Sequence, residues 1–428
     1  MPFLIGKMQC KLDGHKDLTD HKELISYYDV EKIYIPMHHG DSKIEILVKE
    51  GDKVKVGTLL GKRNDHFYVP LFSSCSGVVL GIEKRMHNSA KIVEHVVIEN
   101  DKKYEKETLN TIDINKCTSE ELVDFIKNIG LVGLGGSGFP TYFKYQKIDN
   151  IHTLIINAVE CEPFITSDYI GIKKDPKHLK IGVLALIKAA KVDKCVIAIK
   201  KTKLELIKLL DDLFKDCDNI IIHHTPDIYP MGWERTVLYE VTKLRYDILP
   251  SEVGCIISNV STAISLGKSI ETGLPYTNKI VTISGDAIKE PSNILCPIGT
   301  PIEELIILCK GYTIENLQLI AGGPMMGVAL SNDKVVVTPI TNAYTILKYN
   351  EKSLVSCLRC GSCVESCPSS LMPVNIMDSE KSKNIERLER LKVSKCVECG
   401  ICSYVCPSGI GVTDNIRRAK KTLALRKK

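Results

Sequence analysis

Short runs in which apolar and polar residues alternate fill the first quarter of the chain. Glycine and charged residues break these runs into pieces of the length of single strands joined by turns. Strands are expected at residues 32–37, 43–48, 58–61, 78–82 and 93–99. The pattern therefore predicts a small β module over residues 31–105, preceded by an N-terminal arm over residues 1–30.

The pattern changes after residue 110, where apolar stripes of helical spacing alternate with continuous apolar runs. Thr118 and Ser119, followed by Glu120 and Glu121, are typical of a helix N-terminus and predict a helix at 119–128. Further helices are expected at 177–190, at 203–214 and from about residue 261, and strands at 153–158, 194–199, 219–223 and 255–258. This alternation predicts an α/β domain over residues 110–275, built on a parallel and mostly buried sheet.

The remaining chain divides into two further parts. Residues 276–335 predict short strands separated by turns at Gly285, Gly311, Gly322, Gly323 and Gly327. Residues 345–428 contain regularly spaced cysteines, and the charged stretch 379–392 between them predicts a solvated helix. The expected fold class is a multidomain chain of α/β and α+β units.

Composition narrows the function classes. The chain of 428 residues is 44% hydrophobic and 25% charged, which is ordinary for a globular protein. Its net charge of +5 is spread along the sequence, so nucleic-acid binding is not expected. The basic segment 417–428 is the exception, and a solvated tail and a surface-binding patch both stay open for it. We expect neither a membrane span nor a signal peptide, and hence a cytosolic chain.

The 17 cysteines need a chemical explanation, because cytosolic disulfides are rare. Eight of them form two copies of one pattern, C-x2-C-x2-C-x3-C-P, which is the spacing of bacterial ferredoxins with two 4Fe–4S clusters. The other nine are scattered, and most are expected to be small buried hydrophobic residues.

Each cysteine run is expected to serve both clusters. Three thiolates within seven residues can hold one face of a cubane, whereas the fourth lies too far round and reaches the other cluster. One cluster is therefore expected on Cys357, Cys360, Cys363 and Cys406, and the other on Cys396, Cys399, Cys402 and Cys367. Paired zinc sites are the alternative, but two complete runs closed by Pro368 and Pro407 fit zinc poorly.

A glycine-rich loop follows the helix predicted at 119–128. Residues 133–138 contain G-x-G-x-x-G, but a helix precedes the loop and a strand follows it, which is the reverse of a Rossmann fingerprint. Glycines at this density indicate that the backbone comes close to a flat or phosphorylated ligand. An ordinary surface turn is the alternative.

Three later segments carry polar residues that could serve the same site. Residues 157–163 place two carboxylates after a predicted strand, residues 232–236 contain the only tryptophan, and residues 258–262 lie at a strand-to-helix junction. A helix N-terminus favours anions. For Glu160 and Glu162, buried salt bridges are the alternative.

At this point the chain resembles a known family. GLGGSGFPTYFKY (133–145), NAVECEP (157–163) and SNVST (258–262) are similar to the flavin-contacting stretches of the NADH-binding subunit of respiratory complex I. The order of all parts is closer to the RnfC family, one component of the Rnf electron-transport complex. YPMGWERT (229–236), AGGPMMG (321–327) and CLRCGSCVESCPSSLMP (357–373) resemble signatures of that family.

The resemblance implies a fold and a set of site residues. It implies a barrel-sandwich hybrid module, an α/β flavin domain, a β-grasp ligand-binding module and a two-cluster ferredoxin-like domain. The residues that it places at the FMN and nicotinamide site are Gly133, Gly135, Gly136, Gly138, Phe139 and Lys144. Those that it assigns to flavin or nucleotide are Asn157, Glu160, Glu162, Asn259, Thr262 and, after a one-residue shift, Glu234.

The resemblance also implies a function. The chain would exchange hydride with NAD(H) at FMN and pass single electrons through two 4Fe–4S clusters, with no catalytic acid or base. It would be the NAD-side subunit of an ion-translocating ferredoxin:NAD+ oxidoreductase, held peripherally on the cytoplasmic side of the membrane by membrane and iron–sulfur subunits. Ferredoxin would be an indirect partner. A soluble donor to a reductase, such as proline reductase, and a relay without flavin stay open as alternatives.

Overall fold

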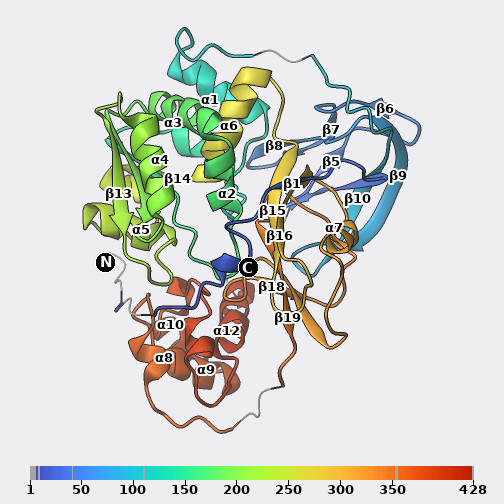
Figure 1. Cartoon of the computed structure of the whole chain (residues 1–428). Coiled ribbons are helices and arrows are strands. Elements are labelled where there is room, and N and C mark those ends of the chain that lie inside the picture. Colours follow the sequence, from blue (N-terminus) through green and yellow to red (C-terminus); the bar gives the residue numbers. More distant parts are fainter. Residues whose placement is uncertain (1–5, 8–9, 41, 109–110, 352–354, 427–428) are drawn as a thin grey trace.

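The computed structural model describes all residues except 1–5, 8–9, 41, 109–110, 352–354 and 427–428, and it divides into four units joined by an N-terminal arm (Figure 1). The arm, dark blue in Figure 1, runs from the helical C-terminal unit up to the central sheets. In the part of the chain that the structure describes, every helix is too short or too polar to span a bilayer.

The N-terminal β module consists of two small sheets around a shared core. The first sheet has the order β2-β10-β9-β6 and the second β5-β7-β8. Their strands, together with the short pair β3–β4, are β2 (Lys32–Pro36), β3 (His38–His39), β4 (Ser42–Lys43), β5 (Glu45–Ile46), β6 (Lys53–Val54), β7 (Leu59–Asn64), β8 (Tyr68–Phe72), β9 (Gly77–Met86) and β10 (Ile92–Asn100). Ile33, Leu60, Val96 and Ile98 are completely buried between the sheets. The sequence pattern missed β8, which pairs with β7 as a hairpin.

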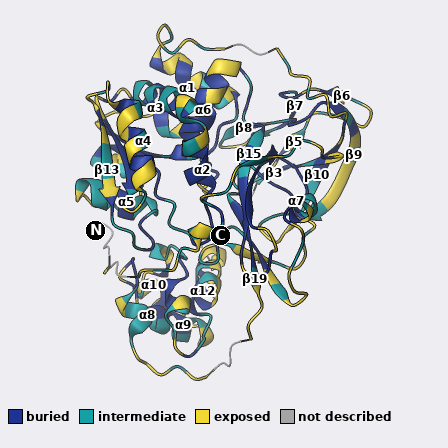
Figure 2. Ribbon diagram, in the orientation of Figure 1, coloured by how far each residue is buried: buried dark blue, intermediate teal, exposed yellow. Residues whose placement is uncertain are grey.

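The α/β unit is built on a parallel four-stranded sheet in the order β13-β12-β11-β14. Its elements are α1 (Ser119–Asn128), β11 (Thr153–Asn157), α2 (Ser167–Lys174), α3 (Pro176–Ala190), β12 (Lys194–Lys200), α4 (Leu204–Phe214), β13 (Ile220–Thr225), α5 (Glu234–Thr242), β14 (Cys255–Asn259) and α6 (Val260–Thr272). Helices α3 and α6 pack backbone to backbone, because a Cβ at Gly182 would lie 1.7 Å from the carbonyl oxygen of Ala263. Helix α2, which the sequence pattern missed, is almost wholly buried (Figure 2).

The third unit is a six-stranded mixed sheet in the order β1-β16-β15-β19-β17-β18. Its elements are β1 (Ile25–Ser26), β15 (Asn278–Ser284), β16 (Ser292–Pro297), α7 (Ile302–Leu308), β17 (Leu317–Ala321), β18 (Val328–Leu330) and β19 (Ala343–Lys348). The sheet continues past residue 335, the expected end of this module, because β19 lies between β15 and β17 and pairs with both. Strand β1 comes from the N-terminal arm, so the arm is part of this sheet.

The C-terminal helical unit contains α8 (Ser362–Glu365), α9 (Pro373–Lys381), α10 (Ile385–Arg390), α11 (Ile401–Tyr404) and α12 (Val412–Arg426). The single helix expected at 379–392 is wrong. Lys383 has φ +52°, and Asn384 caps α10 by accepting the backbone N–H of Arg387, so two helices meet there. The basic segment from residue 417 to 426 is not a free tail, because it lies in α12 and Lys420 donates to the carbonyl oxygen of Cys396 at 3.0 Å.

Candidate functional site

The glycine loop, residues 133–139, closes on itself between α1 and the sheet. Gly133 N–H donates to the carbonyl oxygen of Phe139 at 2.8 Å, and Gly138 N–H donates to that of Gly133 at 3.0 Å. The tip of the loop, residues 135–137, is exposed. Gly136 has φ +102°, and a Cβ placed on it would meet no atom within 4 Å. The loop therefore presents bare backbone to open space, where a flat ring can lie against it.

The underside of the loop rests on the N-terminus of α6. Thr262 Oγ1 accepts the backbone N–H of Leu134 at 3.0 Å. Asn259 caps α6 by accepting the N–H of Ser261, and a Cβ at Gly135 would lie 2.9 Å from its side-chain nitrogen. The structure thus brings Asn259 and Thr262 to the loop, and it explains why position 135 needs a glycine.

The loop lies over the carboxyl edge of the parallel sheet. Asn157 ends β11 and Asn259 ends β14, and the two are register partners on neighbouring strands. Strands β12 and β13, which follow β11 in the sequence, lie on one side of β11, whereas β14 lies on its other side. The strand order therefore reverses between β11 and β14. Open α/β sheets bind ligands at that point. Asn157 holds the edge by donating to the carbonyl oxygen of Gly232 at 2.8 Å.

A lysine and a glutamate form an ion pair beside this edge of the sheet. Lys144 Nζ donates to the carbonyl oxygen of Ile257 at 2.7 Å and lies 3.8 Å from a carboxylate oxygen of Glu234. Burial lowers the pKa of Lys144, and Glu234 partly offsets this effect. Glu234 also accepts the hydroxyl of Tyr246 at 2.9 Å. The two residues form one ion pair at the edge of the sheet, and its ammonium can serve an anionic ligand group.

Phe139, the last residue of the loop, lies at a contact between two units. Its ring packs against Phe67 of the β module and Phe143, with ring centroids 5.5 and 5.8 Å away. The ring therefore joins two units and is engaged by aromatic neighbours rather than lying at the exposed tip of the loop. The place of Phe139 at the FMN and nicotinamide site stays a prediction.

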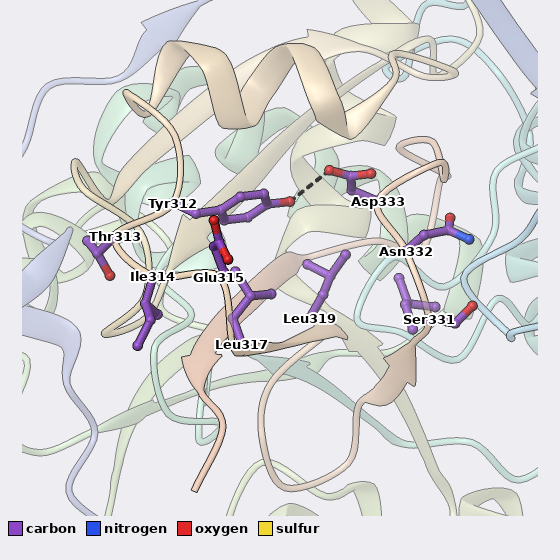
Figure 3. Close-up of a pocket in the computed structure, with 10 residues that line it drawn as sticks. Tyr312, Thr313, Ile314, Glu315, Leu317, Leu319, Ser331, Asn332 and Asp333 are labelled. Atoms are coloured by element: carbon purple, nitrogen blue, oxygen red, sulfur yellow. Dashed lines mark hydrogen bonds between the residues drawn. The ribbon is translucent and has the colours of Figure 1, made fainter.

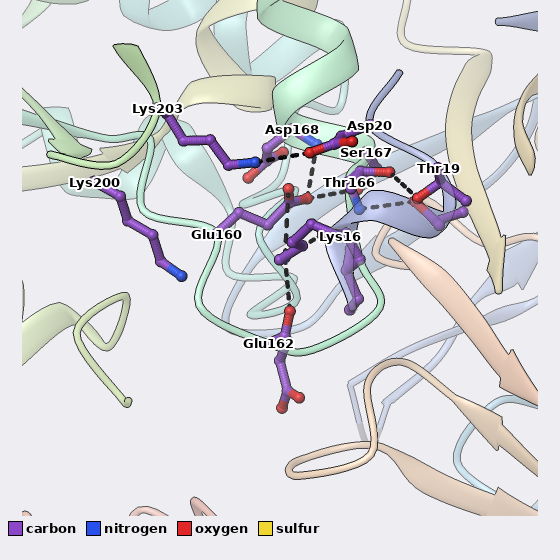
Figure 4. A network of polar contacts seen from close by, with 12 residues as sticks. Lys16, Thr19, Asp20, Glu160, Glu162, Thr166, Ser167, Asp168, Lys200 and Lys203 are labelled. Carbon is purple, nitrogen blue, oxygen red and sulfur yellow. Dashed lines mark hydrogen bonds and ion pairs between the residues drawn. The ribbon is translucent and has the colours of Figure 1, made fainter. Parts of the chain in front are cut away.

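Glu160 belongs to a largely buried network with the N-terminal arm (Figure 4). It accepts the backbone N–H of Asp168 at 2.9 Å, and Lys16 Nζ lies 3.8 Å from its other oxygen. Burial raises the pKa of Glu160 to about 7, although Lys16 opposes the rise, and burial lowers the pKa of Lys16. Asp168 also accepts from Asn259 at 2.8 Å, so this network continues to the glycine loop.

The hydrogen-bond partners of the Glu162 carboxylate lie away from the glycine loop. Its carboxylate accepts the backbone N–H groups of Met325 at 3.3 Å and Met326 at 2.8 Å in the third unit. A Cβ at Gly323 would lie 2.3 Å from this carboxylate, which requires the glycine there. Burial raises the pKa of Glu162 to about 7 despite these two hydrogen bonds. The two predicted carboxylates therefore separate, with Glu160 near the loop network and Glu162 at a junction between units.

Three charged residues that lie in this region were not identified from the sequence. Asp168 lies at the start of α2, Lys16 lies in the arm, and Lys279 of β15 donates to the carbonyl oxygen of Leu134 at 3.2 Å. Lys279 is buried, and burial lowers its pKa to about 8. The Thr166–Ser167–Asp168 run is a helix-start signal that could have located α2. Lys16 and Lys279 carry no local signal, because they reach the site from distant parts of the chain.

The eight patterned cysteines line two separate cavities in the helical unit. The first cysteine cavity is lined by Cys357, Cys360, Cys363 and Cys406, and the second cysteine cavity by Cys367, Cys396, Cys399 and Cys402. Each cavity combines three cysteines of one run with the last of the other, which is the grouping expected from the spacing. In the described residues, no three His, Cys, Asp or Glu side chains gather closely enough to hold a single metal ion.

The two runs share their local backbone. Gly361 and Gly400 have φ +84° and +80° and begin the short helices α8 and α11. Backbone N–H groups also point at sulfur, as Glu398 N–H does toward Cys396 Sγ at 3.4 Å and Leu371 N–H toward Cys367 Sγ at 3.4 Å. Such donors stabilise thiolates that bind a cluster. The donor set, the cavities and the N–H groups fit two cubane clusters.

The second cysteine cavity adjoins the α/β unit. Tyr229, which is 2% exposed, donates its hydroxyl to the carbonyl oxygen of Cys399 at 2.8 Å. A Cβ at Gly400 would lie 2.4 Å from the carbonyl oxygen of Met325, the residue held by Glu162. The first cysteine cavity, in contrast, has exposed Leu358 and Cys360 in its wall.

A further hollow lies on the third unit (Figure 3). Tyr312 and Asp333, joined by a 2.9 Å hydrogen bond, lie on one side of it, and Leu317 and Leu319 lie on another. None of the predicted site residues lines this hollow.

Comparisons with known proteins match every unit. Residues 9–103 match the RnfC barrel sandwich hybrid domain, 126–268 the Nuo51 FMN-binding domain, 280–329 the SLBB domain, and 356–410 the 4Fe-4S dicluster domain. The predictions of an FMN-binding domain and a two-cluster domain are thereby confirmed.

Similar chains come from several bacteria. The C subunit of the proton-translocating ferredoxin:NAD(+) oxidoreductase complex of Clostridium ljungdahlii is 32% identical over 374 residues, covering 84% of this chain and 81% of the relative. The C subunit of the Na(+)-translocating complex of Acetobacterium woodii is 31% identical, covering 84% and 83%. The C subunit of an ion-translocating oxidoreductase complex of Vibrio cholerae is 31% identical, covering 88% and 50%.

A solved structure shares the fold. An NAD+-reducing [NiFe]-hydrogenase in its H2-reduced state superimposes with a TM-score of 0.51 at 16% identity, covering 73% of this chain and 62% of the hydrogenase chain. At this identity the likeness concerns the fold alone.

Proposed function

Because this chain belongs to the RnfC family, the C subunits of ion-translocating ferredoxin:NAD+ oxidoreductase (Rnf) complexes, we propose that it connects NAD(H) with single-electron carriers through FMN and two 4Fe–4S clusters. One observation carries the proposal. A single chain places an open glycine loop at the carboxyl edge of a parallel sheet and packs one of two four-cysteine cavities against the same unit. FMN, when bound, takes two electrons as hydride and releases them one at a time.

The glycine loop and its neighbours would hold the flavin. The bare backbone at Gly135 and Gly136 would lie against the ring, while the N-terminus of α6 at Asn259 and Thr262 attracts a phosphate. Lys144 would add a positive charge at the same edge of the sheet. Asn157 would hold this edge in place through Gly232. Glu160 would act on the site through Asp168, and Glu162 would fix the junction to the third unit.

The contacts of the two cysteine cavities support an order of electron transfer. The second cysteine cavity would hold the cluster nearer the flavin, because Tyr229 of the α/β unit bonds directly to the Cys399 peptide. The first cysteine cavity would hold the outer cluster, with Leu358 in its wall 66% exposed. Electrons would then pass between the outer cluster and a protein partner.

We also propose a fold type and residue limits for each of the four units. We assign a barrel-sandwich hybrid fold to residues 31–105, an α/β flavin fold to 110–275, and a ferredoxin-like fold to 345–428. The β-grasp module would run from 276 to 348 rather than to 335, because β19 completes its sheet.

Cofactor content tests the assignment of both cofactors. Full-length protein purified without oxygen should contain about eight iron and eight acid-labile sulfide per chain, since eight thiolates serve two cubanes, together with one FMN. Iron analysis, an assay of the sulfide released by acid, and flavin fluorescence after denaturation measure the three quantities. Two zinc ions per chain without visible absorbance would contradict the clusters. Clusters without flavin would favour a ferredoxin-like relay.

Fractionation tests the proposed setting. The membrane and iron–sulfur subunits of an Rnf-type complex would hold the chain on the cytoplasmic side of the membrane, with ferredoxin as an indirect partner. The chain should therefore sediment with membranes at low salt and be released by a high-salt or alkaline wash, since such contacts are screened by salt. Recovery wholly in the soluble fraction of native extracts would instead favour a soluble donor to a reductase, such as proline reductase.

A further inference from the structure

A side chain of the β module reaches into the glycine loop. His39 of β3 lies with its Nε2 atom 2.7 Å from the carbonyl oxygen of Gly138. Gly138 is buried, has φ +62° and stands two residues after Gly136, whose backbone faces open space. The hydrogen bond therefore holds Gly138, where the chain leaves the loop, directly beside the exposed tip.

The neighbours of His39 determine which nitrogen carries the proton. Arg63 Nη1 lies 3.1 Å from His39 Nδ1, and a guanidinium can only donate. His39 Nδ1 must therefore accept, which leaves the hydrogen on Nε2 to be donated to Gly138. Arg63 is itself held by Asp65, whose carboxylate accepts from its Nε at 2.7 Å. Burial also lowers the pKa of His39, which favours the neutral ring.

The β7–β8 hairpin, which carries Arg63, also contacts the residues that follow Gly138. Phe67, between β7 and β8, packs edge-on against Phe139 with ring centroids 5.5 Å apart. The backbone N–H of Tyr68 donates to the hydroxyl of Tyr142 at 3.2 Å. Several contacts between the β module and the α/β unit thus involve residues that follow the loop tip.

We propose that His39 is a positioning residue for the flavin site, and that Arg63 fixes it as the Nε2–H tautomer so that the β module determines the shape of the glycine loop. This inference rests on the proposed function, because it assumes that the loop binds FMN. It gives the N-terminal module a role inside the site, in addition to any part that it has in contacts with other subunits.

Three variants of the full-length protein separate this role from general damage to the module. His39→Leu removes the donor at similar volume, and His39→Gln keeps an N–H donor at a similar reach. His87→Leu is the matched control, because His87 is a half-buried residue of the same module that lines the same cavity as His39, and its ring bonds to Ser89 rather than to the loop. FMN dissociation constants are measured by fluorescence on flavin-stripped protein. Hydrogen exchange of residues 133–139 is followed without flavin.

The expected pattern is specific. His39→Leu should bind FMN roughly threefold to tenfold more weakly, the effect of one lost hydrogen bond, and should exchange the loop amides faster. His39→Gln should restore most of the affinity, and His87→Leu should match the parent. Equal affinity and equal exchange in His39→Leu would overturn the inference, as would a His39→Gln variant as weak as His39→Leu. A parent that binds no FMN would overturn the proposed function, while faster exchange in His39→Leu alone would still support the positioning of the loop.

Discussion

Replacing Gly136 with valine should weaken flavin binding enough that the purified protein loses FMN and no longer exchanges electrons between NAD(H) and the clusters, while both clusters stay in place. Gly136 is exposed, has φ +102° and faces open space, so a branched side chain there would occupy the place proposed for the ring. The cysteine cavities lie in a separate helical unit and should not change. We expect FMN affinity to fall on the order of a hundredfold, as for steric overpacking of a fitted site. Dithionite should still reduce the clusters of this variant.

The control for Gly136→Val is Gly51→Val. Gly51 has φ +87°, is exposed and also meets no atom within 4 Å of an added Cβ, but it lies in a turn of the β module. Both substitutions strain the backbone similarly, so only the loop variant should lose flavin. If Gly136→Val binds FMN and exchanges electrons with NAD(H) as well as the parent does, the loop is not the flavin site.

Replacing Cys406 with serine should remove the outer cluster alone. Cys406 lines the first cysteine cavity with Cys357, Cys360 and Cys363, although it belongs to the second run along the sequence. We expect the iron content to fall from about eight to about four per chain, because one of two four-iron clusters is lost. The EPR signal of the cluster nearer the flavin should persist. Cys367→Ser should give the reciprocal result.

Cys217→Ser is the matched control for the cluster variants. Cys217 is a partly exposed cysteine that packs beside the core of the α/β unit and lines neither cysteine cavity. It should keep the full iron content and both EPR signals. If Cys406→Ser instead loses the cluster of Cys396, Cys399 and Cys402, each run closes its own cubane and the crossed arrangement is wrong.

Local patterns are enough to predict the parts of the site that depend on short segments. The cysteine spacing predicts the grouping that lines the two cavities, because the chemistry of a cubane limits which thiolates can share it. Asn157 and Asn259 are expected to serve the same site as the glycine loop because each lies at the end of a predicted strand, and they are register partners at one edge of the sheet. Strand and helix periods are likewise local, and the predicted parallel sheet is present.

Contacts between distant segments could not be predicted in this way. Lys16 meets Glu160 across 144 positions, and no period or cap signals this approach. Lys279 and His39 reach the loop from different units for the same reason. Strand β19 escapes prediction because its place in the sheet depends on pairing with β15 and β17 rather than on its own pattern.

Two further errors have local causes. The charged stretch 379–392 predicts one helix because its composition is helical throughout, whereas the left-handed Lys383 and the cap at Asn384 divide it. The basic residues after 417 suggest a tail or a patch, but Arg417 and Lys420 both bind Glu398 beside the second cysteine cavity. A run of like charges does not reveal such a partner.

The most direct test of the proposed function follows electrons between the clusters and the nicotinamide. Full-length protein with FMN is reduced with dithionite, freed of excess reductant without oxygen, and mixed with NAD+, while EPR follows the reduced clusters and absorbance follows NADH. We predict that the cluster signals disappear as NADH forms, and that flavin-stripped protein and Gly136→Val show neither change. Equal oxidation of the clusters by NAD+ in flavin-stripped protein, or clusters that stay reduced in the FMN-replete parent, would contradict the proposed function.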